Sequence, residues 1–187
     1  MGIADQVRRV TAPILFTPRL ILRRPEGQDY EAWAAFSAEP DTMRYLGGVQ
    51  DRMAAWRTLC AIVGAWDVRG HSMFSVIERA TGHWIGRIGP HEPEGWPAPE
   101  IGWGIAAAYA GQGYASEAAT AATDYAVEVL GWPDVIHTIH PDNAASIALA
   151  ERLGSRRREG AVFQHPVGGA LGIWGQTAAE WRGRLEG

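Results

Sequence analysis

The fold of this chain is decided by one stretch, EIGWGIAAAYAGQGYASEAATAATDY, which spans residues 100–125. Its first part alternates large apolar residues with glycine or glutamate, and this period of two predicts a strand over 100–107. The apolar side consists of Ile101, Trp103 and Ile105. The other side consists of Glu100, Gly102 and Gly104. Since glycine has no side chain, we expect this second side to form an open trough along the strand.

A glycine turn follows the strand and leads directly into a predicted helix over residues 115–130. The first N–H groups of a helix have no partner within it, and the helix dipole makes that end partly positive. Gly111 and Gly113 would let these groups converge on a phosphate, to which Ser116 could add a hydroxyl. Taken alone, the two glycines also suit an ordinary loop-to-helix junction.

The trough and the turn together favour a narrow ligand with a pyrophosphate at one end and an amide-bearing arm at the other. Coenzyme A has this anatomy. A dinucleotide-binding Rossmann site is a weaker interpretation, because the glycines do not follow the G-x-G-x-x-G pattern.

The segments before this stretch predict strands and helices in alternating groups. The pattern of residues 19–24 predicts a strand with Leu20 and Leu22 on one face. Two helices are expected over 29–39, with Asp29 as its cap, and over 51–66. Two strands within 71–89 flank the turn sequence RATG, and residues 92–99 are too rich in proline and glycine for regular structure.

The segments after it predict a strand over 134–140 and a helix over 143–154 that Asn143 caps and Gly154 ends. Two further strands are expected within 161–165 and 171–176. This order describes a mixed α/β sheet built largely from hairpins. No composition shift marks a boundary, so we expect one domain over residues 1–187.

Composition excludes several classes of function. The net charge of −4 argues against nucleic-acid binding. Cys60 is the only cysteine, so a disulfide framework and a multi-thiolate zinc site are excluded, and we expect no metal. The chain contains no lysine, which removes Schiff-base chemistry and the ordinary P-loop. No run is long enough to span a membrane, and we expect a cytoplasmic protein.

Two segments carry a family resemblance, EIGWGIAAAYAGQGYASEAATAATDYA and HPDNAASIALAERLGS. They resemble the GNAT acyl-CoA N-acyltransferases, in the branch similar to the ribosomal-protein N-terminal acetyltransferases RimJ and RimL. The likeness extends from TPRLILRRPEGQDYEAWAAF to RLGS. It implies a GNAT fold of the α+β type, a mixed and mostly antiparallel sheet of about seven strands flanked by about four helices.

The family signature Q/R-x-x-G-x-G/A falls on residues 110–115. Ala110 stands where the family usually has arginine or glutamine, which removes a side chain but keeps the backbone amides. The resemblance implies that acetyl-CoA lies between the strands 100–107 and 134–140, which splay apart in this family. A backbone N–H near Ile105 or Ala106 would then polarise the thioester carbonyl. The implied cosubstrate-binding residues are Gly104, Ile105, Ala106, Gly111, Gln112, Gly113, Tyr114, Ala115, Ser116, Asn143 and Ser146.

Three residues are candidates for the chemistry. Glu100 is the first choice as general base because it faces the same side as the glycine trough, although a solvated carboxylate at a strand start explains it too. His140 is a second candidate, and a structural histidine is the alternative. Many GNAT enzymes protonate the leaving thiolate with a tyrosine, and Ala150 stands at the corresponding position. Ser146 is the substitute, unless its hydroxyl bonds back to the preceding turn.

The acceptor would be a primary amine, either on a small molecule or at a protein N-terminus. Phe36, Trp96 and Trp103 are the predicted substrate-binding residues, and core packing explains Phe36 equally well. Two other functions stay open at this point, a catalytically silent acyl-CoA-binding module and a scaffold whose glycines only form turns. We expect a monomer or a homodimer that binds neither nucleic acid nor membrane.

Overall fold

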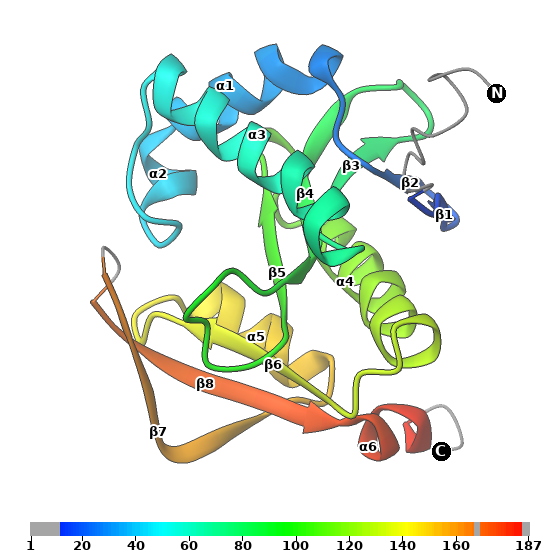
Figure 1. The fold of residues 1–187 in the computed structure, drawn as a ribbon, viewed down its shortest axis with the longest axis vertical. Helices are drawn as coiled ribbons and strands as arrows, with labels where there is room; N and C mark the ends of the chain where they lie inside the picture. The colour runs from blue at the N-terminus through cyan, green and yellow to red at the C-terminus, as the bar shows by residue number, and fades with distance from the viewer. Residues whose placement is uncertain (1–11, 167–168, 185–187) are drawn as a thin grey trace, which may run out of the picture.

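The computed structural model describes residues 12–166 and 169–184. Its centre is an eight-stranded sheet in the order β1-β2-β3-β4-β5-β6-β8-β7, in which only β5 and β6 pair in parallel (Figure 1). The strands are β1 (Leu15–Phe16), β2 (Leu20–Arg23), β3 (Phe74–Glu78), β4 (Trp84–His91), β5 (Glu100–Ile105), β6 (Asp134–Ile139), β7 (Arg156–His165) and β8 (Gly169–Thr177). The mixed, mostly antiparallel sheet expected from the sequence is confirmed, with one strand more than the seven expected.

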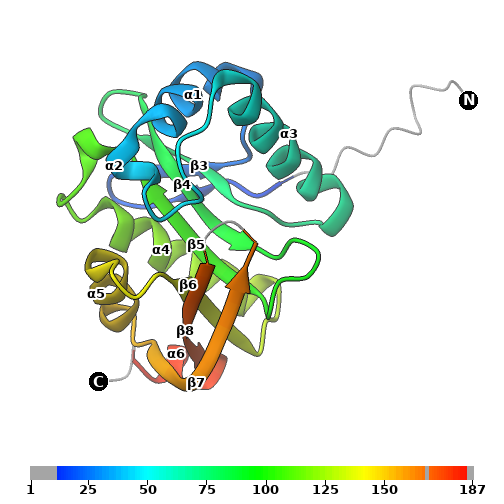
Figure 2. The ribbon, with the colours of Figure 1, turned by 90° about the vertical axis from the view of Figure 1, so that its left-hand side faces the viewer.

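Six helices lie in the described part of the chain: α1 (Tyr30–Ala38), α2 (Pro40–Met43), α3 (Arg52–Arg69), α4 (Tyr114–Asp124), α5 (Ala144–Arg152) and α6 (Ala178–Gly183). Two 3-10 turns, Gly27–Asp29 and Ala107–Tyr109, precede α1 and follow β5, and a π-helical turn over Tyr125–Val129 continues α4. Figure 1 shows α1, α2 and α3 gathered at one end of the molecule, and α5 beside β6. In Figure 2 the strands β7 and β8 close the opposite end.

The sheet is covered on both faces because successive side chains of a strand point to opposite sides. Against one face packs α4, whose Ala118, Ala119 and Ala122 are fully buried and let the helix approach the strands closely. Leu20 and Leu22 of β2 lie in the same core, as their shared face predicted. A second core cluster forms under α1 and α3 on the other face, around Trp33 and Met73.

Several elements differ from the sequence-based expectation. The predicted helix over 115–130 is α-helical only to Asp124. The helical spacing of residues 118, 122, 125 and 129 predicts one apolar face, but Val129 is 70% exposed. The strand expected at 161–165 begins at Arg156. Neither α2 nor α6 was predicted, because each is a short turn that depends on its neighbours. The predicted cap of α5 is confirmed, since Asn143 Oδ1 accepts the N–H of Ser146 at 3.2 Å.

Asp29 occupies the N-cap position of α1, as predicted, but its side chain makes no capping hydrogen bond to that helix. The carboxylate is buried and accepts two hydrogen bonds from the Arg23 guanidinium, at 2.8 and 2.6 Å. Ser75 Oγ donates a third at 2.7 Å. The tertiary ion pair takes the oxygens that a cap would have used.

The strands β5 and β6 pair at a single position, Glu100 with Ile136, and then separate. Beyond that point a side chain replaces the backbone ladder, because His137 Nδ1 bonds to the carbonyl oxygen of Ile101 at 2.8 Å. The indole of Trp103 lies over the same imidazole, with ring centroids 4.6 Å apart. The splay expected from the family resemblance is therefore present.

Candidate active site

Two cavities meet where β5 and β6 separate. The first, of about 470 Å³, is lined by His91, His137, His140 and His165, and we call it the histidine cavity. The second, of about 640 Å³, runs along the turn before α4 to the face of α5, and we call it the glycine groove because Gly104, Gly111 and Gly113 line it. Five residues border both spaces: Tyr45, Leu46, Trp103, Asn143 and Ser146.

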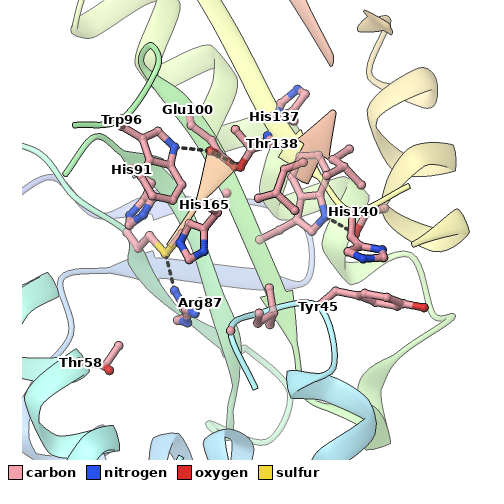
Figure 3. A pocket seen from close by; sticks show the side chains of 18 of the residues that line it. Tyr45, Thr58, Arg87, His91, Trp96, Glu100, His137, Thr138, His140 and His165 are labelled. Carbon is pink, nitrogen blue, oxygen red and sulfur yellow. Dashed lines mark hydrogen bonds between the residues drawn. The ribbon is translucent and has the colours of Figure 1, made fainter. Parts of the chain in front are cut away.

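Glu100 forms part of the wall of the histidine cavity (Figure 3) and is 6% exposed. Its Oε2 accepts hydrogen bonds from the indole N–H of Trp96 and, at 2.9 Å, from the hydroxyl of Thr138. Its Oε1 accepts the Thr138 N–H at 3.2 Å. Burial raises the pKa of Glu100 to about 7, although these three hydrogen bonds favour the charged form. A carboxyl group with this pKa can take up a proton near neutral pH.

Ser146 stands on α5 at the border between the two cavities. Its Oγ accepts a hydrogen bond of 3.1 Å from Nε1 of Trp103, whose indole also lies over His137 between β5 and β6. Because an indole N–H can only donate, the serine oxygen is the acceptor and its own proton stays available to a third group. The contact is with Trp103, not with the preceding turn.

His140 follows β6 and also lines the histidine cavity. Its ring stacks on Tyr45 with centroids 5.0 Å apart, and its Nδ1 accepts the N–H of Asp142 at 3.2 Å. The imidazole is thus held in one orientation, with Nε2 as the nitrogen left for a ligand. His137 lies on the same strand but is 1% exposed, and burial lowers its pKa to about 4.

The glycine groove contains the turn before α4. Gly111 and Gly113 have φ angles of 73° and 81°, the left-handed region that glycine adopts without strain. Gly113 is the N-cap of α4, so the helix begins at Tyr114 with its first amides at the groove. Ser116 also lines the groove. The turn therefore has the form of an anion-binding helix N-terminus.

A family model described as an acetyltransferase (GNAT) domain matches residues 19–156. The chain belongs to the GNAT acetyltransferase family. Among curated proteins, it is 31% identical over 148 residues to YkkB of Bacillus subtilis, an uncharacterised protein, covering 75% of this chain and 83% of that one. A solved acetyltransferase from Agrobacterium tumefaciens is 33% identical, with a TM-score of 0.79 over 88% of this chain and 94% of its own.

The RimJ/RimL-like fold expected from the sequence is the one found. RimL, a ribosomal-protein acetyltransferase solved in complex with coenzyme A, superposes with a TM-score of 0.69 over 88% of this chain and 98% of its own. At 18% identity this likeness concerns the fold alone.

Most of the cosubstrate-binding residues predicted from the GNAT resemblance line the groove: Gly104, Ile105, Gly111, Gly113, Tyr114, Ala115, Ser116, Asn143 and Ser146. Two lie elsewhere. The side-chain amide of Gln112 donates to the carbonyl oxygen of Ala108 at 3.1 Å. The N–H of Ala106 donates to Ile85 O of β4 at 2.9 Å, so it is not available to a thioester carbonyl. Neighbouring amides of a strand point in opposite directions, and the Ile105 N–H therefore points away from β4.

The open trough predicted on the glycine side of β5 is largely covered. A Cβ on Gly104 would lie 2.9 Å from Cζ of Phe36, and one on Gly102 would lie 2.5 Å from Cε of Met73. These glycines thus permit side chains of other elements to approach the strand. Phe36 is 4% exposed and packs on Trp84 in the core, whereas Trp96 and Trp103 line the histidine cavity.

Sequence reasoning missed several residues of the histidine cavity, among them Tyr45, Arg87, His91 and His165. Arg87 and His91 could have been found from the register of β4 against β5. This register places Arg87 opposite Gly104 and His91 opposite Glu100. Residues paired across a sheet share a face, so this register brings both onto the side of Glu100. Only the folded hairpin fixes it.

In the described part of the chain, no helix is both apolar enough and long enough to cross a membrane. The same residues contain no cluster of three or more histidine, cysteine or acidic side chains arranged to hold a metal ion.

Proposed function

We propose that this protein transfers the acetyl group of acetyl-CoA to a primary amine, with Glu100 as the general base. The observation that carries the proposal is a buried carboxyl group with a pKa of about 7 in a cavity that adjoins a groove with an anion-binding turn. The GNAT family to which the chain belongs uses acetyl-CoA as the acyl donor.

The residues of the glycine groove fit this donor. The turn with Gly111 and Gly113 and the first amides of α4 would hold the pyrophosphate, since a side chain at either glycine would crowd the approach. Asn143 and Ser146 of α5 would border the arm that leads to the thioester. When bound, acetyl-CoA supplies an acetyl group activated as a thioester.

Separate groups around the two cavities would handle the proton transfers and the negative charge that develop during the reaction. Glu100 takes a proton from the acceptor ammonium, directly or through one water, and leaves the nitrogen lone pair free to form the new C–N bond. The Ile105 N–H stabilises negative charge on the acyl oxygen. As the C–S bond breaks, its electron pair remains on sulfur, and the second proton of the attacking nitrogen passes to that sulfur through the Ser146 hydroxyl, so that CoA leaves as the thiol. His140 was the second candidate for the base, but its Nδ1 accepts the Asp142 N–H, so the neutral ring carries its proton on Nε2 and would donate to a ligand there.

The test combines binding with turnover. Calorimetry measures acetyl-CoA affinity, and release of free CoA is followed with amino acids, amino-acid amides, peptides with a free N-terminus, and diamines. We expect Glu100→Gln to bind acetyl-CoA as the wild type does but to lose about 100-fold to 10,000-fold in kcat. Glu31→Gln, an exposed glutamate of α1, is the matched control and should change neither quantity.

Two outcomes would contradict the proposal. Absence of acetyl-CoA binding by folded protein would rule out acyl transfer from this donor. Binding with no turnover of any amine would favour the catalytically silent acyl-CoA-binding module.

A further inference from the structure

Arg87 of β4 projects into the histidine cavity without a carboxylate partner among the described residues. Its Nη1 lies 2.9 Å from the thioether sulfur of Met73, and its guanidinium lies 5.4 Å from the centre of the Trp33 ring. A guanidinium has five N–H donors, and a thioether is a weak acceptor. Arg87 is therefore a cation in a cavity wall whose hydrogen-bonding capacity is mostly unused.

Burial lowers the pKa of Arg87 to about 10, and no acidic group counteracts the shift. The group still carries its charge at neutral pH. Arg87 is half-buried, and its remaining N–H groups are open to the cavity, where a bound anion would pair with the guanidinium.

The other charged groups of the cavity have the same sign. Arg57 of α3 also lines it. Two of the four histidines, His91 and His137, are neutral near pH 7 because burial lowers their pKa to about 4. Among the described lining residues, Glu100 has the only carboxyl group, and its pKa of about 7 leaves it partly neutral. The pKa of His91 falls to about 4, first through burial and then through the positive charges of Arg87 and His165. The cavity thus presents positive charge inside a chain of net charge −4.

Arg87 and Glu100 face the same space from two positions on one side of the sheet. Their strand partners are Gly104 and His91 respectively, and residues paired in this way share a face. The Met73 side chain covers Gly102, and its sulfur contacts Arg87. Figure 3 shows Arg87 and Glu100 on the wall of this cavity. A small molecule in the cavity would therefore contact the base at one end and the guanidinium at the other.

We propose that the acceptor carries an oxyanion, a carboxylate or a phosphate, that binds Arg87 while its primary amine lies at Glu100. The planar fork of arginine matches both oxyanions with two parallel hydrogen bonds. The inference rests on the proposed acetyl transfer and narrows its acceptor to small anionic or zwitterionic amines. Diamines and other purely cationic acceptors would be repelled by Arg57 and Arg87.

Matched pairs of acceptors test the proposal in the turnover assay. L-alanine is compared with alaninamide, and O-phosphoethanolamine with ethanolamine. In each pair, we expect the acceptor that carries the oxyanion to have a kcat/KM about 10-fold to 100-fold higher than that of the acceptor without it. The carboxylate and phosphate arms show which oxyanion is preferred. Arg87→Gln should abolish this preference and leave acetyl-CoA affinity unchanged, whereas Arg52→Gln, an exposed arginine of α3, should keep it.

A binding measurement separates failure of this proposal from failure of the proposed function. N-acetyl-L-glutamate and N-acetyl-glycinamide are titrated into wild type and Arg87→Gln, with no turnover required. Binding of the anionic probe that depends on Arg87 supports the oxyanion site even if no acetyl transfer is detected. Equal affinities for the two probes, or an anionic probe that binds Arg87→Gln as tightly, would overturn it, as would a turnover preference for diamines. Thermal melting of Arg87→Gln verifies that the variant is folded.

Discussion

Glu100 shows how burial of one side chain sets the pH range of the proposed reaction. Because desolvation raises its pKa to about 7, the carboxylate needed as a base is present above that pH and is lost below it. We therefore expect kcat/KM to rise about tenfold per pH unit below pH 7 and to level off above it, as measured by CoA release. The neutral Gln of Glu100→Gln should give a low, flat profile between pH 5.5 and 8. An unchanged inflection in that variant would assign the base to another group.

Asp29 is the residue whose replacement should cost most stability outside the site. Among the described residues, removal of its carboxylate leaves the Arg23 guanidinium with a hydrogen bond only to Arg24 O. It also leaves Ser75 Oγ and the Glu26 N–H without this acceptor. We expect Asp29→Ala to lower the free energy of unfolding by about 3 to 5 kcal/mol in urea titrations. Asp51→Ala removes only the cap of α3, a 2.8 Å hydrogen bond to the Ala54 N–H, and should cost about 1 kcal/mol. Similar losses for both would show that the buried ion pair contributes little.

The turn between β5 and α4 is the element on which cosubstrate binding should depend, and two glycines allow a matched test. Gly111 lines the groove, whereas Gly131 lies after the π-helical turn, away from it. Their φ angles are 73° and 69°, and a Cβ would meet nothing within 4 Å at either. We expect Gly111→Ala and Gly131→Ala to lose similar stability, about 1 kcal/mol. Only Gly111→Ala should weaken acetyl-CoA binding in calorimetry, and equal affinities in the two variants would place the cosubstrate elsewhere.

In the whole molecule, the two halves of the sheet are joined at one β5–β6 pair and by His137. Its Nδ1 donates to Ile101 O, since a carbonyl only accepts, and its Nε2 therefore accepts the Ser155 hydroxyl at 3.0 Å. This requires the neutral imidazole, whose folded pKa of about 4 lies below the usual 6.5. A histidine with a lowered pKa stabilises the fold above its unfolded pKa, and that contribution is lost as the pH falls from about 6.5 to about 4.

We expect the free energy of unfolding to drop by about 3 kcal/mol over this interval through His137 alone. Urea titrations of wild type and His137→Gln at pH 7 and pH 4.5 isolate this contribution, because the other titrating groups are common to both. A variant that loses as much stability on acidification as the wild type would contradict the assignment.

Local pattern was enough to predict most of the fold. The alternation in 100–107 predicted β5, and the apolar face that includes Ala118 and Ala122 predicted α4. These signals depend on residues close in the chain, where period and capping act directly. The short elements β1, α2 and α6 lack such a signal, because two to six residues do not complete a periodic face.

The sequence by itself determined the family, the glycine turn and the choice of Glu100 as candidate base, since each depends on residue type and spacing within one segment. Only the tertiary structure decided which groups surround that base. Trp96 and Thr138 bond to Glu100 from a loop and from β6 and favour its charged form, whereas burial of the carboxyl group raises its pKa. The register of β4 against β5 placed Arg87 in the cavity, although the net charge of the chain indicated the opposite sign. Burial and electrostatics depend on distances between groups far apart in the chain, and those distances exist only after the strands have paired.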